Sequence, residues 1–142
     1  RGCSIDARKR DVMSAYRGTV RWAHIDGEHS YEAVRNDLDL VADLMCDGGV
    51  IVLDDMFDTG GPGLTEALFH WLALNPHKAV LFLTGFNKAY LCAPRDLPFF
   101  MRLTHGMPDL LAPMGVEVAA TRSGWGAERP AVGAQTNPIS RS

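Results

Sequence analysis

The chain has 142 residues, of which 46% are hydrophobic and 22% charged, and its formal net charge is −3 at pH 7. This length supports one hydrophobic core and is too short for two large ones. The charges are mixed along the chain, without the basic stripe that phosphate backbones require, so nucleic acid is not expected as a partner. No apolar run approaches the roughly 20 residues that span a bilayer, and residues 1–10 lack the apolar centre of a signal peptide. The sequence therefore predicts a cytoplasmic protein with no membrane partner.

Helical and strand patterns alternate along the chain. Apolar residues at three- and four-residue steps predict a helix over 31–44, with Ser30 as its N-cap. The unbroken apolar run 50–53 predicts a strand that is covered on both faces. In chain order, the expected elements are a helix over 6–16, a strand over 20–25, a helix over 31–44, a strand over 50–53, a helix between the loop 58–63 and Asn75-Pro76, strands over 79–83 and 89–92, and a short helix over 97–104.

This alternation predicts an α/β fold, a three-layer sandwich with a mainly parallel sheet. The link over 84–88 is too short for a parallel crossover, so the last two strands are expected to form an antiparallel hairpin that adds one antiparallel strand at or near the sheet edge. Residues 1–118 are assigned to the domain. Residues 119–142 are rich in Gly, Ser, Pro and Arg and are expected to be a disordered tail.

Carboxylates follow both of the first two expected strands. Asp26 follows the strand over 20–25, while Asp54 and Asp55 follow the strand over 50–53. Ligands of open parallel sheets bind beyond the carboxyl ends of the strands, and the helix between these strands makes them neighbours. Three crowded carboxylates repel one another, and either a raised pKa or a bound cation relieves the repulsion. Oxygen ligands favour a hard cation such as Mg²⁺. The alternative for each residue alone is a helix cap or an Asx-turn.

The histidines and aromatic residues are expected at three kinds of position: the candidate site, the hydrophobic core and the surface. His29, three residues after Asp26, suits a general base because imidazole exchanges a proton near neutral pH, and the open alternative is a loop histidine that caps the helix. His24 lies within a strand and is expected in the core. Trp22, Tyr31 and Trp71 are also expected in the core, whereas His70, His77 and His105 are expected at the surface. The widely spaced cysteines Cys3, Cys46 and Cys92 are expected to be reduced thiols.

Two segments carry a family resemblance. The run VRWAHIDGEHSYEAVRNDLDLVADLMCDGGVIVLDD, residues 20–55, resembles the carboxyl half of the class I S-adenosylmethionine-dependent methyltransferases, in particular the small-molecule O-methyltransferase-like group. The later run FLTGFNKAYLC, residues 82–92, is similar to the closing hairpin of that group. The resemblance covers roughly residues 1–103. It implies a Rossmann-like fold and transfer of a methyl group from S-adenosylmethionine to a small-molecule acceptor.

The resemblance also implies roles for individual residues. Asp26, Asp54 and Asp55 match the ligands of a Mg²⁺ or similar divalent cation, and His29 falls where relatives place a general base. Ser4 matches a segment beside the adenine ring, so Ser4 and Asp26 are the candidate cofactor-binding residues. The glycine-rich cofactor loop of the family has no counterpart in these residues. The resemblance thus implies a partial methyltransferase domain over 1–118, whose exposed sheet edge would favour a homo-oligomer.

Two other classes of function remain open on the sequence. One is a related hydroxylase or tailoring protein of secondary metabolism with the same fold. The other is a non-catalytic domain of this fold that packs against a partner. A phosphoacceptor signalling domain is disfavoured, because the paired acids of such domains follow the first strand, whereas here a third acid precedes the pair.

Overall fold

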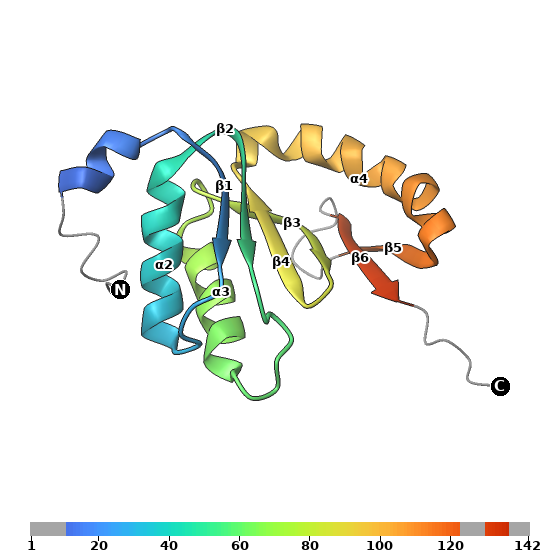
Figure 1. Cartoon of the computed structure of the whole chain (residues 1–142), viewed down its shortest axis with the longest axis horizontal. Helices are drawn as coiled ribbons and strands as arrows, with labels where there is room; N and C mark the ends of the chain where they lie inside the picture. Colours follow the sequence, from blue (N-terminus) through green and yellow to red (C-terminus); the bar gives the residue numbers. More distant parts are fainter. Residues whose placement is uncertain (1–10, 123–129, 137–142) are drawn as a thin grey trace.

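The structure, a computed structural model, describes residues 11–122 and 130–136 (Figure 1). Within this part, helices and strands alternate as far as β3, and the rest of the chain adds two hairpins and a helix. The elements in chain order are η1 (Asp11–Tyr16), β1 (Val20–Ile25), α2 (Tyr31–Leu44), β2 (Met45–Leu53), α3 (Pro62–Leu74), β3 (Val80–Gly85), β4 (Lys88–Cys92), η2 (Pro94–Asp96), α4 (Leu97–Leu111), η3 (Ala112–Met114), β5 (Val116–Arg122) and β6 (Pro130–Thr136).

The strands form one six-stranded sheet in the order β1-β2-β4-β3-β6-β5. The pairs β1–β2 and β3–β6 are parallel, while the other neighbours are antiparallel. β1, β2, β3 and β6 therefore run in one direction, and β4 and β5 run in the other. The α/β prediction is confirmed. The antiparallel strand β4 lies between β2 and β3 and not at the edge, because the hairpin inserts its second strand beside β2.

Local sequence explains the boundaries of α2 and β2. Ser30 caps α2, and its side chain accepts a hydrogen bond of 3.4 Å from the backbone N–H of Ala33. The helix ends at Leu44, and β2 begins at Met45, five residues before the strand that the sequence predicts. Gly49 permits this early start, since a Cβ there would lie 2.9 Å from the carbonyl oxygen of Cys46.

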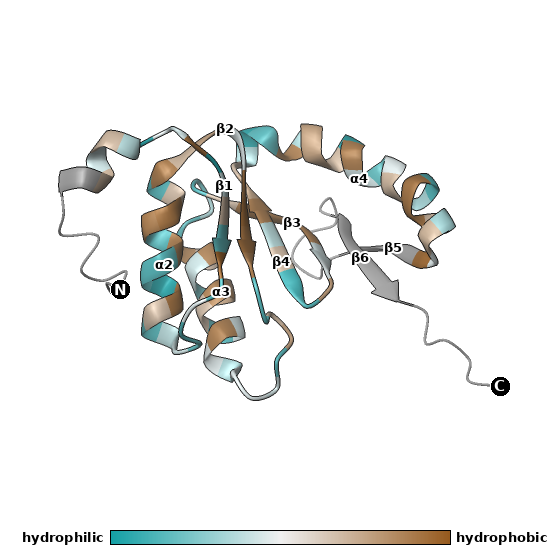
Figure 2. Ribbon diagram, in the orientation of Figure 1, coloured by the Kyte–Doolittle hydropathy of each residue, from teal (hydrophilic) through white to brown (hydrophobic). Residues whose placement is uncertain are grey.

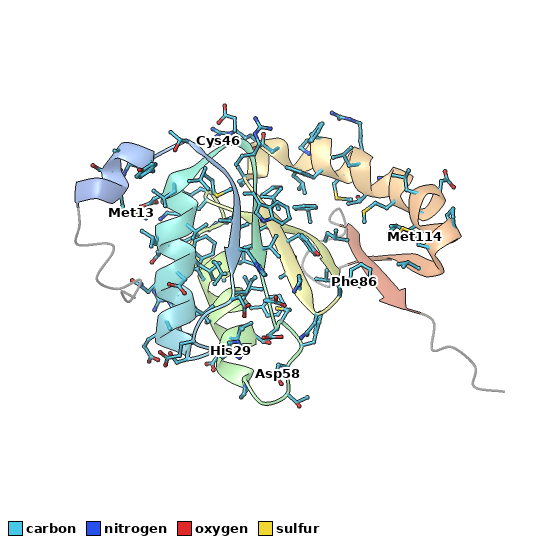
Figure 3. All side chains as sticks on the ribbon, in the orientation of Figure 1. Met13, His29, Cys46, Asp58, Phe86 and Met114 are labelled. Carbon is cyan, nitrogen blue, oxygen red and sulfur yellow. The ribbon has the colours of Figure 1, made fainter. Side chains whose placement is uncertain are left out.

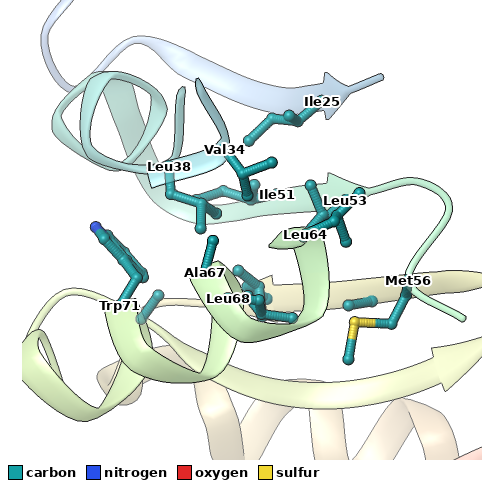
Figure 4. Packing of buried hydrophobic residues seen from close by; sticks show 13 residues of the cluster. Ile25, Val34, Leu38, Ile51, Leu53, Met56, Leu64, Ala67, Leu68 and Trp71 are labelled. Atoms are coloured by element: carbon teal, nitrogen blue, oxygen red, sulfur yellow. The ribbon is translucent and has the colours of Figure 1, made fainter. Parts of the chain in front are cut away.

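One face of the sheet packs against α2 and α3 (Figure 4). Trp71 of α3 is fully buried in this core, as the sequence predicts, and its indole N–H donates to Asp39 Oδ1 at 2.8 Å. Burying a side chain of this size contributes on the order of 3 kcal/mol to folding. The buried cluster consists of Ile25, Val34, Leu38, Ile51, Leu53, Met56, Leu64, Ala67, Leu68, Trp71, Ala79, Ala89 and Leu91.

The other face packs against α4, which makes the third layer (Figures 1 and 2). Phe100 of α4 stacks on Phe82 of β3, with ring centroids 4.6 Å apart. This layer does not cover Trp22, which pairs with Val50 in the register of β1 and β2 but is 60% exposed. The prediction of a core position for Trp22 is therefore wrong, because β1 is an edge strand and α4 packs farther along the sheet.

The segment after residue 118 also differs from the sequence prediction. The structure places Val116–Arg122 and Pro130–Thr136 in the sheet as β5 and β6, where the sequence predicts a disordered tail over 119–142. The two strands pair with each other over seven residues, and β6 extends the sheet from β3. Backbone hydrogen bonds thus order a segment whose composition carries little apolar signal. Among the described residues, no helix has the length and apolar character to cross a membrane.

Candidate functional site

The site lies at the carboxyl ends of β1 and β2. These strands are parallel, with Ile25 directly beside Leu53, so the residues that follow them leave the sheet together. The N–H of Asp54 donates to the carbonyl oxygen of Ile25 at 2.9 Å, which fixes the two strand ends to each other. Figure 3 shows His29 at this end of the molecule and Cys46 at the other. The predicted gathering of residues from both strands is therefore present.

Asp26, His29 and Asp55 form a compact cluster. One ligand atom from each of the three residues lies within 4.8 Å of the other two. His29 Nε2 is 3.4 Å from Asp55 Oδ2, and both side chains are about one third exposed. Among the described residues, neither Asp26 nor Asp55 forms an ion pair with a lysine or arginine. Within the described part of the chain, these two carboxylates thus have no direct lysine or arginine partner, although Lys88 interacts electrostatically with Asp55.

Asp54 has a different environment from Asp55. Its Oδ2 contacts the Lys88 ammonium and lies 3.1 Å from His24 Nε2, while its Oδ1 accepts the N–H of Asp55 at 2.9 Å. The hydrogen bond from Lys88 lowers the pKa of Asp54, partial desolvation opposes this, and the Asp55 N–H and His24 add to the lowering. The same contact raises the pKa of Lys88. Both residues follow the end of β2 at Leu53, and the cluster within 4.8 Å contains Asp55 but not Asp54.

His24 is not a core residue, and the sequence prediction for it is wrong. Its side chain is 43% exposed and contacts Asp54. His24 pairs with Val52 on the face that α4 covers, but it lies on the edge strand beyond the reach of that helix. His24 therefore belongs to the polar surroundings of Asp54.

The turn between β3 and β4 holds Asp55 in place. Phe86 and Asn87 both have positive φ, which is the geometry of a tight two-residue hairpin turn. Asn87 Nδ2 donates to Asp55 Oδ1 at 3.0 Å, and Asn87 Oδ1 accepts the N–H of Phe57 at 2.8 Å. Asp55 itself has a φ of 54°, a strained conformation for a non-glycine residue that these contacts stabilise. The sequence analysis missed Asn87 and Lys88, whose only signal is their place in the short hairpin link.

Gly61, the N-cap of α3, and Gly63 in its first turn pack against His29. An added Cβ at Gly61 would lie 3.2 Å from the Cβ of His29, and one at Gly63 would lie 3.3 Å from the carbonyl oxygen of His29. Asp58 orders the loop before α3 by accepting the N–H of Gly60 at 2.9 Å. Gly61 therefore packs near Nδ1 of the His29 imidazole, while Asp55 lies near Nε2.

The donor set of the cluster fits a divalent cation. Two carboxylates are typical protein ligands of Mg²⁺, which keeps its remaining positions for water or substrate oxygens. An imidazole as third ligand would shift the preference toward Mn²⁺ or a later transition metal. Of the residues predicted to contact the cofactor, Asp26 lies in the cluster, and Ser4 lies outside the described residues. The candidate ion ligands that the structure brings together are thus Asp26 and Asp55, with His29 beside them.

A comparison with known protein families finds a match in the part of the chain that contains the candidate site. A family model described as a methyltransferase domain matches residues 2–56. No curated protein matches the chain. The matched residues include β1, α2 and β2, together with Asp26, His29, Asp54 and Asp55. The match therefore supports a methyltransferase domain in the segment that forms the candidate site.

Proposed function

We propose that the protein transfers a methyl group from S-adenosylmethionine to a hydroxyl of a small molecule, with a divalent cation, Mg²⁺ in the first instance, at Asp26 and Asp55. The observation that carries the proposal is the cluster of Asp26, His29 and Asp55 within 4.8 Å, placed beyond two paired parallel strands. Its position in the segment that matches a methyltransferase domain supports the same chemistry.

His29 takes the role of general base in this proposal. The neutral imidazole accepts the hydroxyl proton of the acceptor at Nε2, the nitrogen that faces Asp55. Once its proton is on Nε2, the acceptor oxygen would take the methyl group that bound S-adenosylmethionine supplies, with the electron pair of the old bond left on the sulfur. Asp55 stabilises the imidazolium that forms, because its Oδ2 lies 3.4 Å from Nε2.

Asp26 and Asp55 together supply the negative charge that holds an ion beside the acceptor. When bound, S-adenosylmethionine supplies the electrophilic methyl group, and the ion supplies positive charge that favours the ionised hydroxyl. Asn87 orients Asp55 through Oδ1 and leaves Oδ2 available. The acceptor would be positioned by these groups, which raises the rate by holding the reacting atoms in contact.

In this proposal Asp54 does not bind the ion but contacts the backbone of Asp55 and the side chain of Lys88. Sequence reasoning assigns it as a third ion ligand, and to bind an ion directly it would have to exchange the Lys88 contact. In its present arrangement both of its oxygens accept hydrogen bonds. We infer that Asp54 fixes the backbone of Asp55 and that Lys88 limits the total negative charge at the strand ends.

Transfer of a labelled methyl group tests the proposal. The complete protein, with any residues that precede Arg1 in its gene, is incubated with methyl-labelled S-adenosylmethionine and a panel of small phenols, catechols and sugars. The expected result is labelled product in the presence of Mg²⁺, its loss on chelation, and a loss of at least ~100-fold in His29→Ala, within the usual range for general-base catalysis. Unchanged turnover after exhaustive chelation would refute the role of the ion, and the absence of S-adenosylmethionine binding by calorimetry would refute the methyltransferase proposal.

A further inference from the structure

The outer side of α4 carries a stripe of exposed apolar side chains. Phe99 and Leu103 are half exposed, and Leu110 and Met114 are 72% exposed. Figure 2 shows the hydrophobic segments along this helix, and Figure 3 places Met114 at its far end. Large apolar side chains exposed in a row mark an interaction surface more often than chance exposure of single residues does. We call these four residues the outer stripe.

The outer stripe is separate from the face of α4 that packs on the sheet. Phe100 and Thr104 are buried, and Phe100 packs into the core with Met101 and Met107. Residues 99, 103, 106 and 110 recur at steps of four, three and four, which keeps them on one side of a helix. α4 therefore has one apolar side that the sheet covers and a second that no described element covers.

The order of residues along the outer stripe is close to symmetric. In an antiparallel pair of α4 helices, Leu103 of one copy would lie opposite Leu110 of the other, and Phe99 would lie opposite Met114, which belongs to η3 just after the end of α4. The centre of this arrangement falls at Gly106, where an added Cβ would meet nothing within 4 Å. A small residue at the crossing point lets two helix backbones approach closely. The stripe is thus complementary to itself under a two-fold rotation.

The charges beside the outer stripe have the same symmetry. Arg102 and Asp109 are exposed, lie seven residues apart on one flank, and form no ion pair within the described part of the chain. A two-fold axis perpendicular to both helices keeps this flank on the same side. Arg102 of one copy then lies near Asp109 of the other, and the reciprocal pair forms at the opposite end. Opposite charges meet twice, while the same charges would be remote from each other.

We propose that the outer stripe of α4 is a homodimer interface in which two copies pack antiparallel about Gly106. Half to three quarters of each stripe side chain is available, so the two copies would bury on the order of 1,000 Å² in total. This area lies at the low end of specific interfaces. The dimer is therefore expected to dissociate in the micromolar range. The site at the carboxyl ends of β1 and β2 is not involved, so this proposal stands apart from the methyltransferase proposal.

A charge-swap experiment tests the interface. Sedimentation velocity over roughly 1–200 μM measures the monomer–dimer equilibrium of the wild type and of Arg102→Glu, Asp109→Arg and the double variant R102E/D109R. Each single variant places like charges opposite each other in both copies and is expected to weaken the dimer at least ~10-fold. The double variant restores both pairs with reversed polarity and is expected to recover most of the wild-type affinity.

Two further variants control for folding and for general apolar exposure. Leu110→Glu removes the most exposed helical residue of the outer stripe and is expected to give a monomer, with circular dichroism unchanged. Leu74→Glu makes the same change at a 57% exposed leucine of α3 and is expected to leave the equilibrium unchanged. A wild type that stays monomeric throughout the range, or a dimer that the single charge variants do not weaken, would overturn the proposal.

Discussion

The two ends of strand β2 both carry acidic residues, in opposite electrostatic settings. At the amino end, Asp47 contacts Arg95, and the N–H of Gly48 donates to Asp96 Oδ2 at 2.9 Å. At the carboxyl end, Asp54 is paired with Lys88, but its neighbour Asp55 has no lysine or arginine partner among the described residues and faces His29. The carboxyl end therefore carries a carboxylate that has no direct lysine or arginine partner among the described residues.

The two ends of β2 also differ in shape, and the cavity lies at the amino end, opposite the candidate site. A cavity of about 340 Å³ lies at the amino end, lined by residues that include Met45, Cys46, Ile51 and Cys92. Its basic residues are already engaged, since Lys78 is 3.1 Å from Asp43 and Arg95 contacts Asp47. The lysine and the arginine that line this cavity are thus already paired with carboxylates. The candidate site residues therefore lie at the end of β2 where Asp55 has no direct lysine or arginine partner among the described residues, and the cavity lies at the other end.

The largest expected effect concerns the reactivity of Cys92, which lines the cavity at the amino end of β2. Burial raises the pKa of the Cys92 thiol to about 12, and Asp96 adds to the rise. At pH 8 the thiolate fraction should therefore increase about 1,000-fold when unfolding returns the group to its usual pKa of 9.0. Iodoacetamide labelling followed by peptide mapping, with and without urea, measures this change at Cys92. Fast labelling of Cys92 in the folded protein would show that the cavity is open to reagents.

The second prediction concerns Asp55 and its counterpart at the other end. Asp55→Asn keeps a residue that tolerates a φ of 54° and removes one charge, so Mn²⁺ affinity is expected to fall at least ~100-fold. Asp47→Asn removes one charge from the amino end and is the matched control, with an affinity within about two-fold of wild type. Calorimetric titration with Mn²⁺ compares the two. Equal losses would mean that only total charge matters, and the distinction between the two ends would fail.

The third prediction concerns the hairpin turn that orients Asp55. Asn87→Gly preserves the positive φ of 62° and removes the hydrogen bond to Asp55 Oδ1, so Mn²⁺ affinity is expected to fall about 10-fold. Phe86→Gly is the control in the same turn, because Phe86 also has positive φ but its side chain has no polar group to bond the carboxylates. If both variants bind equally, Asn87 acts on the turn and does not orient Asp55.

The smallest expected effect is the pH dependence of stability from Asp54. Its pKa lies below the usual 3.8, so its contribution to stability is present above that value and is lost as the pH falls through the lower, folded pKa. Lys88→Met removes the main cause of the lowering. Urea unfolding between pH 5 and pH 2 should therefore show a smaller loss of stability in this variant than in the wild type. An identical pH dependence would contradict the inferred contact.

The sequence predicts the order and type of the elements between residues 20 and 92 because their signals are local, although β2 begins five residues before its predicted start. The spacing in α2, the apolar run of β2 and the short link between β3 and β4 each depend on nearby residues, and the structure confirms them. The errors concern long-range placement. His24 and Trp22 show strand signals, but only the sheet order reveals that β1 is an edge strand. The pairing of β5 with β6 likewise depends on partners that composition does not encode.

For the candidate site too, the sequence predicts the residues at the strand ends but not those that come from a distant hairpin. The sequence locates Asp26, His29 and Asp55 at two adjacent strand ends, and the structure brings them together. It does not separate Asp54 from Asp55, because the contacts that distinguish them, from Lys88 to Asp54 and from Asn87 to Asp55, arise only in the folded chain. Lys88 and Asn87 reach the site from a hairpin more than 30 residues later in the chain. Residues of that kind become visible only when the hairpin is placed beside β2.

An anomalous difference map from crystals soaked in Mn²⁺ tests the central claim most directly. The account predicts a peak between the carboxylates of Asp26 and Asp55, beside the His29 imidazole, with Asp54 still in contact with Lys88. Crystals of Asp55→Asn grown and soaked in the same way provide the control and should lack the peak. A peak held by Asp54 in place of Lys88, or ordered Mn²⁺ only in the cavity at the amino end of β2, would contradict the account.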